Sequence, residues 1–273
     1  MTFIDKLRQA SRKNNSLLCV GLDVDVDRIP RFLLSEKDPV GAFNRAIIEA
    51  TSDLVCAYKP NAAFYEALGE TGWRALRQTR REVPEDIPVI VDAKRGDIGN
   101  TARMYARAFF EDMGFDAITV NPYMGLDAVE PFLKFDDKCA FVLCLTSNPS
   151  AQDFQRLSGE RGPLFQEVAR QVVRWSHHGP CGLVVGATQA GDLRSIREIA
   201  PHLPILIPGV GTQGGDLVWA IRNGVDASGE LAIVNVCRSI IYVSDEEDFA
   251  QRARQEAMRL RDEINRIRNA PNT

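Results

Sequence analysis

Eight short apolar segments, each followed by a segment with helical periodicity, constrain the fold of this chain more than any other feature. Each is a continuous run rich in Val, Ile, Leu, Ala and Cys, as is typical of parallel strands buried on both faces. The predicted strands are 17–23, 54–59, 88–93, 116–121, 139–145, 181–186, 204–208 and 231–236. Helices are predicted near 2–13, 39–51, 62–80, 98–113, 126–135, 160–174, 189–200, 213–224 and 245–268.

This alternation predicts an α/β protein. Eight strand–helix units without a break in composition favour one closed barrel, a single-domain (β/α)8 TIM barrel over residues 1–273. The alternative is an open, doubly wound sheet, which usually has fewer strands and a glycine-rich turn after the first. The first strand here runs into LCVGLDVDVD (18–27), with carboxylates where a dinucleotide-binding turn would have glycines. A dinucleotide fold is therefore disfavoured.

Charge and cysteine usage narrow the function classes. The chain has 33 Lys and Arg against 37 Asp and Glu, a net charge of −4, and no long basic run, which argues against nucleic acid as a partner. No apolar stretch reaches the roughly 18–20 residues of a membrane span, and the amphipathic first residues do not resemble a signal peptide. The six cysteines form no C-x-x-C motif, which favours buried, reduced thiols. We expect a cytoplasmic protein without a membrane partner.

Charged residues follow three of the predicted strands, at the barrel end where functional groups gather. Asp23 ends the first strand, Lys59 the second, and the third runs into DAKRGD (92–97). Asp92 and Lys94 are two residues apart, so on an extended chain they point to the same side. A lysine among carboxylates keeps its proton, and it can stabilise a developing carbanion and protonate it. A salt-bridged strand end, with Asp97 capping the next helix, remains an equal alternative.

A glycine-rich turn follows the seventh predicted strand, in the sequence PGVGTQGG (208–215), and Arg238 follows the eighth. Backbone N–H groups of such turns bind phosphate, often after these two strands of a barrel, and Gln213 and Arg238 would add side-chain donors. The glycines could instead serve only a tight turn, but the arginine on the next strand favours a phosphorylated small molecule.

The strand ends do not carry the residues that acyl transfer or a histidine metal site would need. They offer no nucleophile–base pair, and His177, His178 and His202 fall in helices or loops. Acyl-transfer triads and histidine metal sites are therefore disfavoured.

The chain resembles the orotidine 5′-monophosphate decarboxylase family, in particular its second bacterial-type subgroup. The similarity runs in order through nearly the whole chain. The matching segments are GLDVD (21–25), YKPNAAFYE (58–66), VIVDAKRGDIGNTA (89–102), TVNPYMGLDAVEPF (119–132), LCLTSNPSA (143–151), GLVVGATQ (182–189), IPGVGTQGGD (207–216) and VNVCRSIIY (234–242).

The resemblance implies a cofactor-free decarboxylase that converts orotidine 5′-monophosphate (OMP) to UMP. It places Asp92 and Lys94 beside the carboxylate that leaves, and Lys59 on the ribose. It also implies a homodimer with a shared active site, in which Asp97 comes from the partner subunit and completes a Lys-Asp-Lys-Asp network.

The resemblance also implies the substrate-binding residues. Asp23 and Thr101 would bind ribose hydroxyls, and Thr101 and Ile98 would reach across the dimer. Ser147 would contact the pyrimidine amide, and Gln213 and Arg238 would bind the phosphate. Pro208, at the end of its strand, is also implied as a substrate-binding residue. Two positions depart from the commoner pattern: Cys237 stands before the arginine in place of a glycine, and the fifth strand ends in TSN (146–148).

Two other functions remain open. A relative with the same D-x-K-x-x-D core, such as hexulose-phosphate synthase or keto-gulonate-phosphate decarboxylase, would need Mg²⁺ to stabilise an enediolate. A non-catalytic nucleotide-binding barrel is the other alternative, but a binder has no need for this array of charges.

Overall fold

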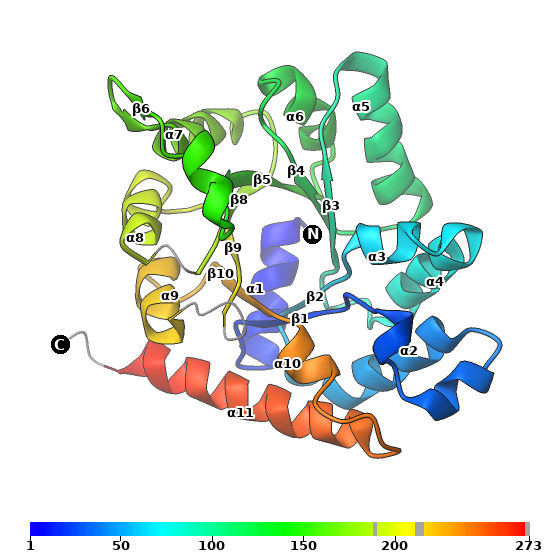
Figure 1. The fold of residues 1–273 in the computed structure, drawn as a ribbon. Coiled ribbons are helices and arrows are strands. Elements are labelled where there is room, and N and C mark those ends of the chain that lie inside the picture. Colours follow the sequence, from blue (N-terminus) through cyan, green and yellow to red (C-terminus); the bar gives the residue numbers. More distant parts are fainter. Residues whose placement is uncertain (188–189, 211–215, 271–273) are drawn as a thin grey trace.

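The computed structural model describes residues 1–187, 190–210 and 216–270, and within them eight parallel strands form a near-closed barrel surrounded by helices (Figure 1). The strands are β1 (Leu18–Gly21), β2 (Ala57–Lys59), β3 (Ile90–Arg95), β4 (Ala117–Val120), β5 (Cys139–Leu145), β8 (Cys181–Val185), β9 (Ile205–Pro208) and β10 (Ala232–Val236). They pair in the order β2-β1-β10-β9-β8-β5-β4-β3. The bridges Tyr58–Val89 and Asn61–Asp92 bring β2 beside β3 and close the ring. The predicted TIM barrel is confirmed.

Helices cover the outside of the barrel (Figure 1). They are α1 (Phe3–Lys13), α2 (Pro39–Thr51), α3 (Ala62–Glu66), α4 (Gly69–Glu82), α5 (Gly99–Ala106), α6 (Leu126–Leu133), α7 (Leu164–Trp175), α8 (Ala190–Ile199), α9 (Leu217–Gly224), α10 (Arg238–Ile241) and α11 (Phe249–Asn269). A π-helical turn, Arg107–Asp112, continues α5. Within the described ranges, no helix combines the length and apolar character that crossing a bilayer requires.

Three predicted helices whose bounds lie among the described residues differ from the structure by four residues or by a break, and one of them, predicted over 245–268, begins at Phe249. The helix predicted over 62–80 is split into α3 and α4, because Gly69 takes a positive φ of 63° at the junction. The helix predicted to begin at 160 begins at Leu164 instead. The preceding residues form a small antiparallel hairpin of β6 (Ser158–Gly159) and β7 (Gly162–Pro163).

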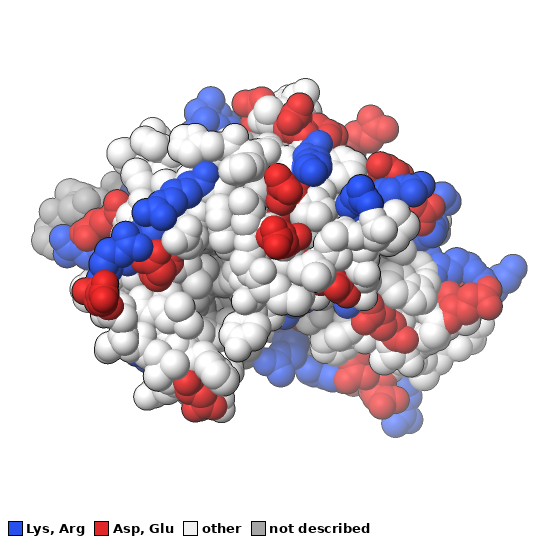
Figure 2. Space-filling view, turned by 90° about the horizontal axis from the view of Figure 1, so that it is seen from above, with Lys and Arg blue, Asp and Glu red and all other residues white. Residues whose placement is uncertain are grey.

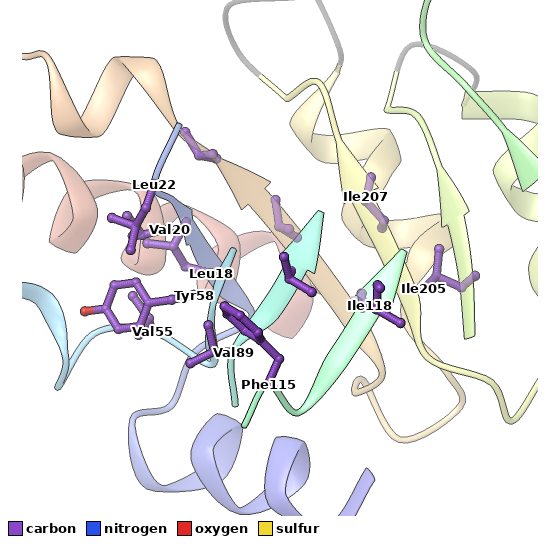
Figure 3. Close-up of a cluster of buried hydrophobic side chains, with 14 of the residues drawn as sticks. Leu18, Val20, Leu22, Val55, Tyr58, Val89, Phe115, Ile118, Ile205 and Ile207 are labelled. Atoms are coloured by element: carbon purple, nitrogen blue, oxygen red, sulfur yellow. The ribbon is translucent and has the colours of Figure 1, made fainter. Parts of the chain in front are cut away.

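The apolar side chains form two layers, one on each side of the barrel wall. Alternate residues such as Leu18 and Val20 point outward and pack under the helices (Figure 3). The intervening residues, such as Cys19, fill the barrel interior. Each large side chain buried in this way contributes about 1.5–3 kcal/mol. All six cysteines are free and five of them are buried, as their spacing predicted.

Helix α1 covers the amino-terminal end of the barrel. Its Phe3 meets the ring of Phe141 edge-on, at 5.6 Å between centroids. Its Lys6 forms a buried ion pair with Asp116, 2.6 Å from Nζ to Oδ1. Because this end is filled, the space for a ligand lies at the carboxyl ends of the strands.

Candidate active site

A cavity of about 640 Å³ opens at the carboxyl ends of the barrel strands. This volume is in the range of small-molecule sites. Its lining comprises Asp23, Asp25, Arg28, Lys59, Asn61, Phe64, Asp92, Lys94, Thr119, Leu143, Thr146, Ser147, Asn148, Val184, Leu206, Pro208, Gly209, Val210, Asn235, Cys237, Arg238 and Tyr242. Charged groups of both signs therefore share one small space with a partly apolar floor.

Four charged side chains form an alternating array on one wall. The ammonium group of Lys94 lies 2.6 Å from Oδ1 of Asp92, and that of Lys59 lies 3.0 Å from Oδ2 of the same carboxylate. Lys59 also approaches Oδ1 of Asp23 at 3.8 Å. The expectation that the ends of the first three strands bring these groups together is confirmed.

Burial and mutual attraction act in opposite directions on these groups. Burial lowers the pKa of Lys59, but the carboxylates of Asp92 and Asp23 outweigh it, and the net shift is upward. Burial raises the pKa of Asp92, but the two lysines and hydrogen bonds from Lys94 and Thr119 outweigh it, and that pKa falls well below its usual value. Lys59 and Asp92 therefore stay charged throughout the neutral range.

The backbone at Lys94 is strained. Its φ is +46°, a left-handed conformation that costs a non-glycine residue roughly 1–2 kcal/mol. The pairing of β3 with β4 is irregular here, since Val91 pairs with Ile118 while Arg95 pairs with Val120. This bulge turns the Lys94 side chain into the cavity. The backbone N–H of Lys94 donates to the hydroxyl of Thr119 at 2.9 Å.

Asp23 offers an acceptor to a ligand. Its buried Oδ1 has no hydrogen-bond partner among the described residues. The segment around it is fixed by Tyr242, whose hydroxyl accepts from the Asp25 N–H at 2.6 Å and donates to the Asp23 carbonyl at 3.2 Å. The guanidinium of Arg28 stacks on the Tyr242 ring, 4.1 Å from its centroid. The Asp23 side chain as a whole is 21% exposed and lines the cavity, so its carboxylate can accept from a ligand hydroxyl.

Pro208, Gly209 and Arg238 line the cavity at the ends of β9 and β10, and β10 pairs with β1. Arg238 is exposed and begins α10, and no ion pair joins it to another described residue. Cys237 precedes Arg238 and has room for its side chain because residue 21 is a glycine. A Cβ at Gly21 would lie 2.6 Å from the Cβ of Cys237. Gln213, the other predicted phosphate ligand, lies outside the described residues.

Ser147 lies in the cavity at the end of β5, as predicted. Gly186 allows this placement, because a Cβ at that position would lie 2.9 Å from both the backbone N and the Cβ of Ser147.

Three predicted site residues are not part of the cavity within this chain. Asp97, Ile98 and Thr101 precede or begin α5, and none of them lines it. Ile98 is 53% exposed, and the Asp97 carboxylate accepts from the Ile98 N–H at 2.8 Å. A single chain therefore does not complete the predicted four-residue network.

A family model described as the orotidine 5′-phosphate decarboxylase / HUMPS family matches residues 16–253. The chain belongs to this family. The decarboxylase of Herpetosiphon aurantiacus is 52% identical over 257 residues, which cover 93% of this chain and 95% of that relative.

Two solved structures support this membership of the decarboxylase family. Leishmania donovani OMP decarboxylase superposes with a TM-score of 0.87 and 40% identity, covering 99% of this chain and 100% of that one. Leishmania donovani UMP synthase gives a TM-score of 0.90 and 40% identity, and this chain spans 58% of its length.

Several residues that line the cavity of this chain were not predicted from its sequence. Arg28 and Tyr242 come from segments without a strand-end position, and their stacking joins parts of the chain that are far apart in sequence. Thr119 and Asn235 are polar residues inside otherwise apolar strands. That break in an apolar run was a signal that could have identified them.

Proposed function

We propose that this cavity decarboxylates OMP to UMP and CO2 without a cofactor, as a step of UMP biosynthesis. The observation that carries the proposal is the set of ion pairs that joins Lys59, Asp92 and Lys94 within the alternating array. Orotidine 5′-phosphate decarboxylases of similar length, such as that of Dehalococcoides mccartyi at 48% identity, support it. We further propose that residues 1–273 form one domain, that the protein is cytoplasmic, and that it falls in the second bacterial-type subgroup.

The chemical difficulty is the electron pair left on C6 of the pyrimidine when CO2 departs. The bond from C6 to the carboxylate breaks, and the pair remains on C6. The Lys94 ammonium stabilises this charge and then donates its proton to C6, so that OMP and one proton give UMP and CO2. Asp92, near the substrate carboxylate, disfavours the ground state and holds Lys94 in place. We rank ground-state stress second to electrostatic stabilisation.

The remaining side chains are proposed to bind the rest of the nucleotide. Lys59 and the partly exposed carboxylate of Asp23 suit ribose hydroxyls. Ser147 would contact the pyrimidine amide, with Pro208 beside it. Arg238, which has no ion-pair partner among the described residues, and Gln213 would bind the phosphate, whose binding energy is available for the chemical step.

We also propose a homodimer in which Asp97, Ile98 and Thr101 enter the partner's cavity. Ile98 and Met104 are 53% and 51% exposed, and Tyr123 is 85% exposed. Figure 2, which looks onto the side where Figure 1 places α5 and α6, shows uncharged surface between scattered charged side chains. Exposed apolar surface of this kind marks interfaces, and a second copy would supply the carboxylate that one chain does not bring to the array.

The first test follows the ultraviolet absorbance of OMP with purified protein, with and without EDTA. We expect rapid conversion to UMP at equal rates in both, since Lys94 needs no metal to stabilise the carbanion. OMP turnover lost with EDTA and restored by Mg²⁺ would contradict the cofactor-free mechanism. A folded protein without OMP turnover would favour a Mg²⁺-dependent sugar-phosphate enzyme of the same family, and next a non-catalytic binder.

Replacing Arg238 with alanine should lower kcat/KM for OMP by roughly 10²- to 10³-fold, because charge-assisted bonds to the phosphate are lost. The same change should leave the slow turnover of orotidine, which has no phosphate, unaffected. Arg222→Ala, an exposed arginine at the end of α9, is the matched control. An unchanged kcat/KM for OMP would show that Arg238 does not bind the phosphate.

A further inference from the structure

A threonine hydroxyl is buried directly behind the charged array. Thr119 lies in β4, between Ile118 and Val120, and is 1% exposed. It lines the floor of the cavity, whereas its two neighbours pack outward under the helices. An isolated hydroxyl in such a place costs free energy unless it is hydrogen-bonded. Its partners therefore explain why the hydroxyl is tolerated there.

The hydroxyl uses both its acceptor and its donor. It accepts the backbone N–H of Lys94 at 2.9 Å and donates to Oδ1 of Asp92 at 2.8 Å. The same Oδ1 receives the Lys94 ammonium at 2.6 Å. One side chain thus holds the backbone of the proposed proton donor and the carboxylate that orients it.

The first of these bonds replaces a bond of the strand ladder. Between Val91 and Arg95 the regular pairing of β3 with β4 is interrupted, and Lys94 has a φ of +46°. A lysine does not adopt this conformation without compensation from its surroundings. The Thr119 hydroxyl gives its N–H a partner in that conformation.

The second bond fixes the direction of the carboxylate. Oδ2 of Asp92 is held by Lys59 at 3.0 Å, and Oδ1 is shared by Lys94 and Thr119. Without the hydroxyl, Oδ1 keeps one mobile partner, because the Lys94 side chain is 49% exposed. The carboxylate could then rotate with the lysine.

We infer that Thr119 is a positioning residue for decarboxylation, which holds the strained Lys94 backbone and the Asp92 carboxylate so that both groups face one point of the cavity. This inference rests on the function proposed above for Lys94 and Asp92. Thr119 itself acts through these two residues.

The inference is tested with Thr119→Val, which keeps the shape and removes the hydroxyl, and Thr119→Ser, which keeps the hydroxyl. We expect Thr119→Val to lower kcat for OMP by about 10- to 100-fold, as for a lost hydrogen bond to a charged group, with KM changed less than threefold. Thr119→Ser should recover most of this loss. A kcat of Thr119→Val within twofold of the unaltered protein would overturn the inference, as would a serine variant no better than valine.

The matched control is Thr51→Val. Thr51 is fully buried, and its hydroxyl also makes two hydrogen bonds, to the Ile47 carbonyl and the Tyr58 hydroxyl, away from the cavity. We expect both valine variants to lower Tm to a similar degree, but only Thr119→Val to lower kcat. Equal losses of kcat in the two variants would reduce the role of Thr119 to general stability.

A crystal structure of Thr119→Val separates failure of this inference from failure of the proposed function. We expect Lys94 to leave the positive-φ region and its ammonium to leave Asp92. If both stay in place, Thr119 does not position them, whatever the protein catalyses. If both move while the unaltered protein fails to decarboxylate OMP, positioning holds and only the proposed reaction is wrong.

Discussion

Replacing Lys94 with alanine should lower kcat for OMP by at least about 10⁴-fold, because one change removes both the cation that stabilises the C6 carbanion and its proton donor. KM should change far less, since the ribose and phosphate contacts remain. The measurement is steady-state turnover of OMP together with circular dichroism and the hydrodynamic size.

The variant should remain folded. The Lys94 side chain is 49% exposed, so its removal leaves no internal cavity, and Asp92 keeps Lys59 and Thr119 as partners. Lys37→Ala, an exposed lysine outside the cavity, is the control and should be fully active. Turnover of Lys94→Ala equal to that of the unaltered protein would exclude the mechanism.

The second large effect concerns the shared site. Asp97→Ala alone should lose most activity, because the Lys-Asp-Lys-Asp network in the partner's cavity then lacks the carboxylate of Asp97. Mixing equal amounts of Asp97→Ala and Lys94→Ala subunits and allowing them to exchange should restore activity to about one quarter of the unaltered protein, since random pairing makes half of the dimers mixed and each mixed dimer holds one complete site.

The control for this experiment is the mixture of Asp92→Ala with Lys94→Ala. Both residues belong to the same cavity wall of one chain, so no pairing of these subunits yields a complete site. Recovery in this mixture, or none in the first, would place Asp97 outside the partner's active site. A protein that elutes as a monomer at assay concentration while fully active would also exclude the shared site.

The barrel was predictable because its strands are buried on both faces. Continuous apolar runs such as 139–145 match β5 residue for residue. The ends of such strands meet at one rim, so Asp23, Lys59 and Asp92 could be placed together from their positions alone. The predicted boundaries were less accurate where a single backbone angle decides the outcome, as at Gly69 between α3 and α4.

Other parts of the site could not be predicted for physical reasons. The hydrogen bonds of Thr119 depend on a bulge in β3 that follows from the packing of two strands. The stacking of Arg28 on Tyr242 joins residues separated by most of the chain. The position of Asp97 relative to a complete site depends on a second chain, which a single sequence does not contain.

The ion pair of Lys6 with Asp116 beneath the barrel has a consequence for how this protein can change. Asp116 also accepts the Val89 N–H at 2.9 Å and lies 3.4 Å from Arg80, so it joins three other segments to its own at the end opposite to the cavity. Adaptation to heat or cold can therefore act on these ties without altering the groups that meet the nucleotide. Substitutions that change the thermal stability of this barrel and substitutions that change its substrate can therefore be selected independently.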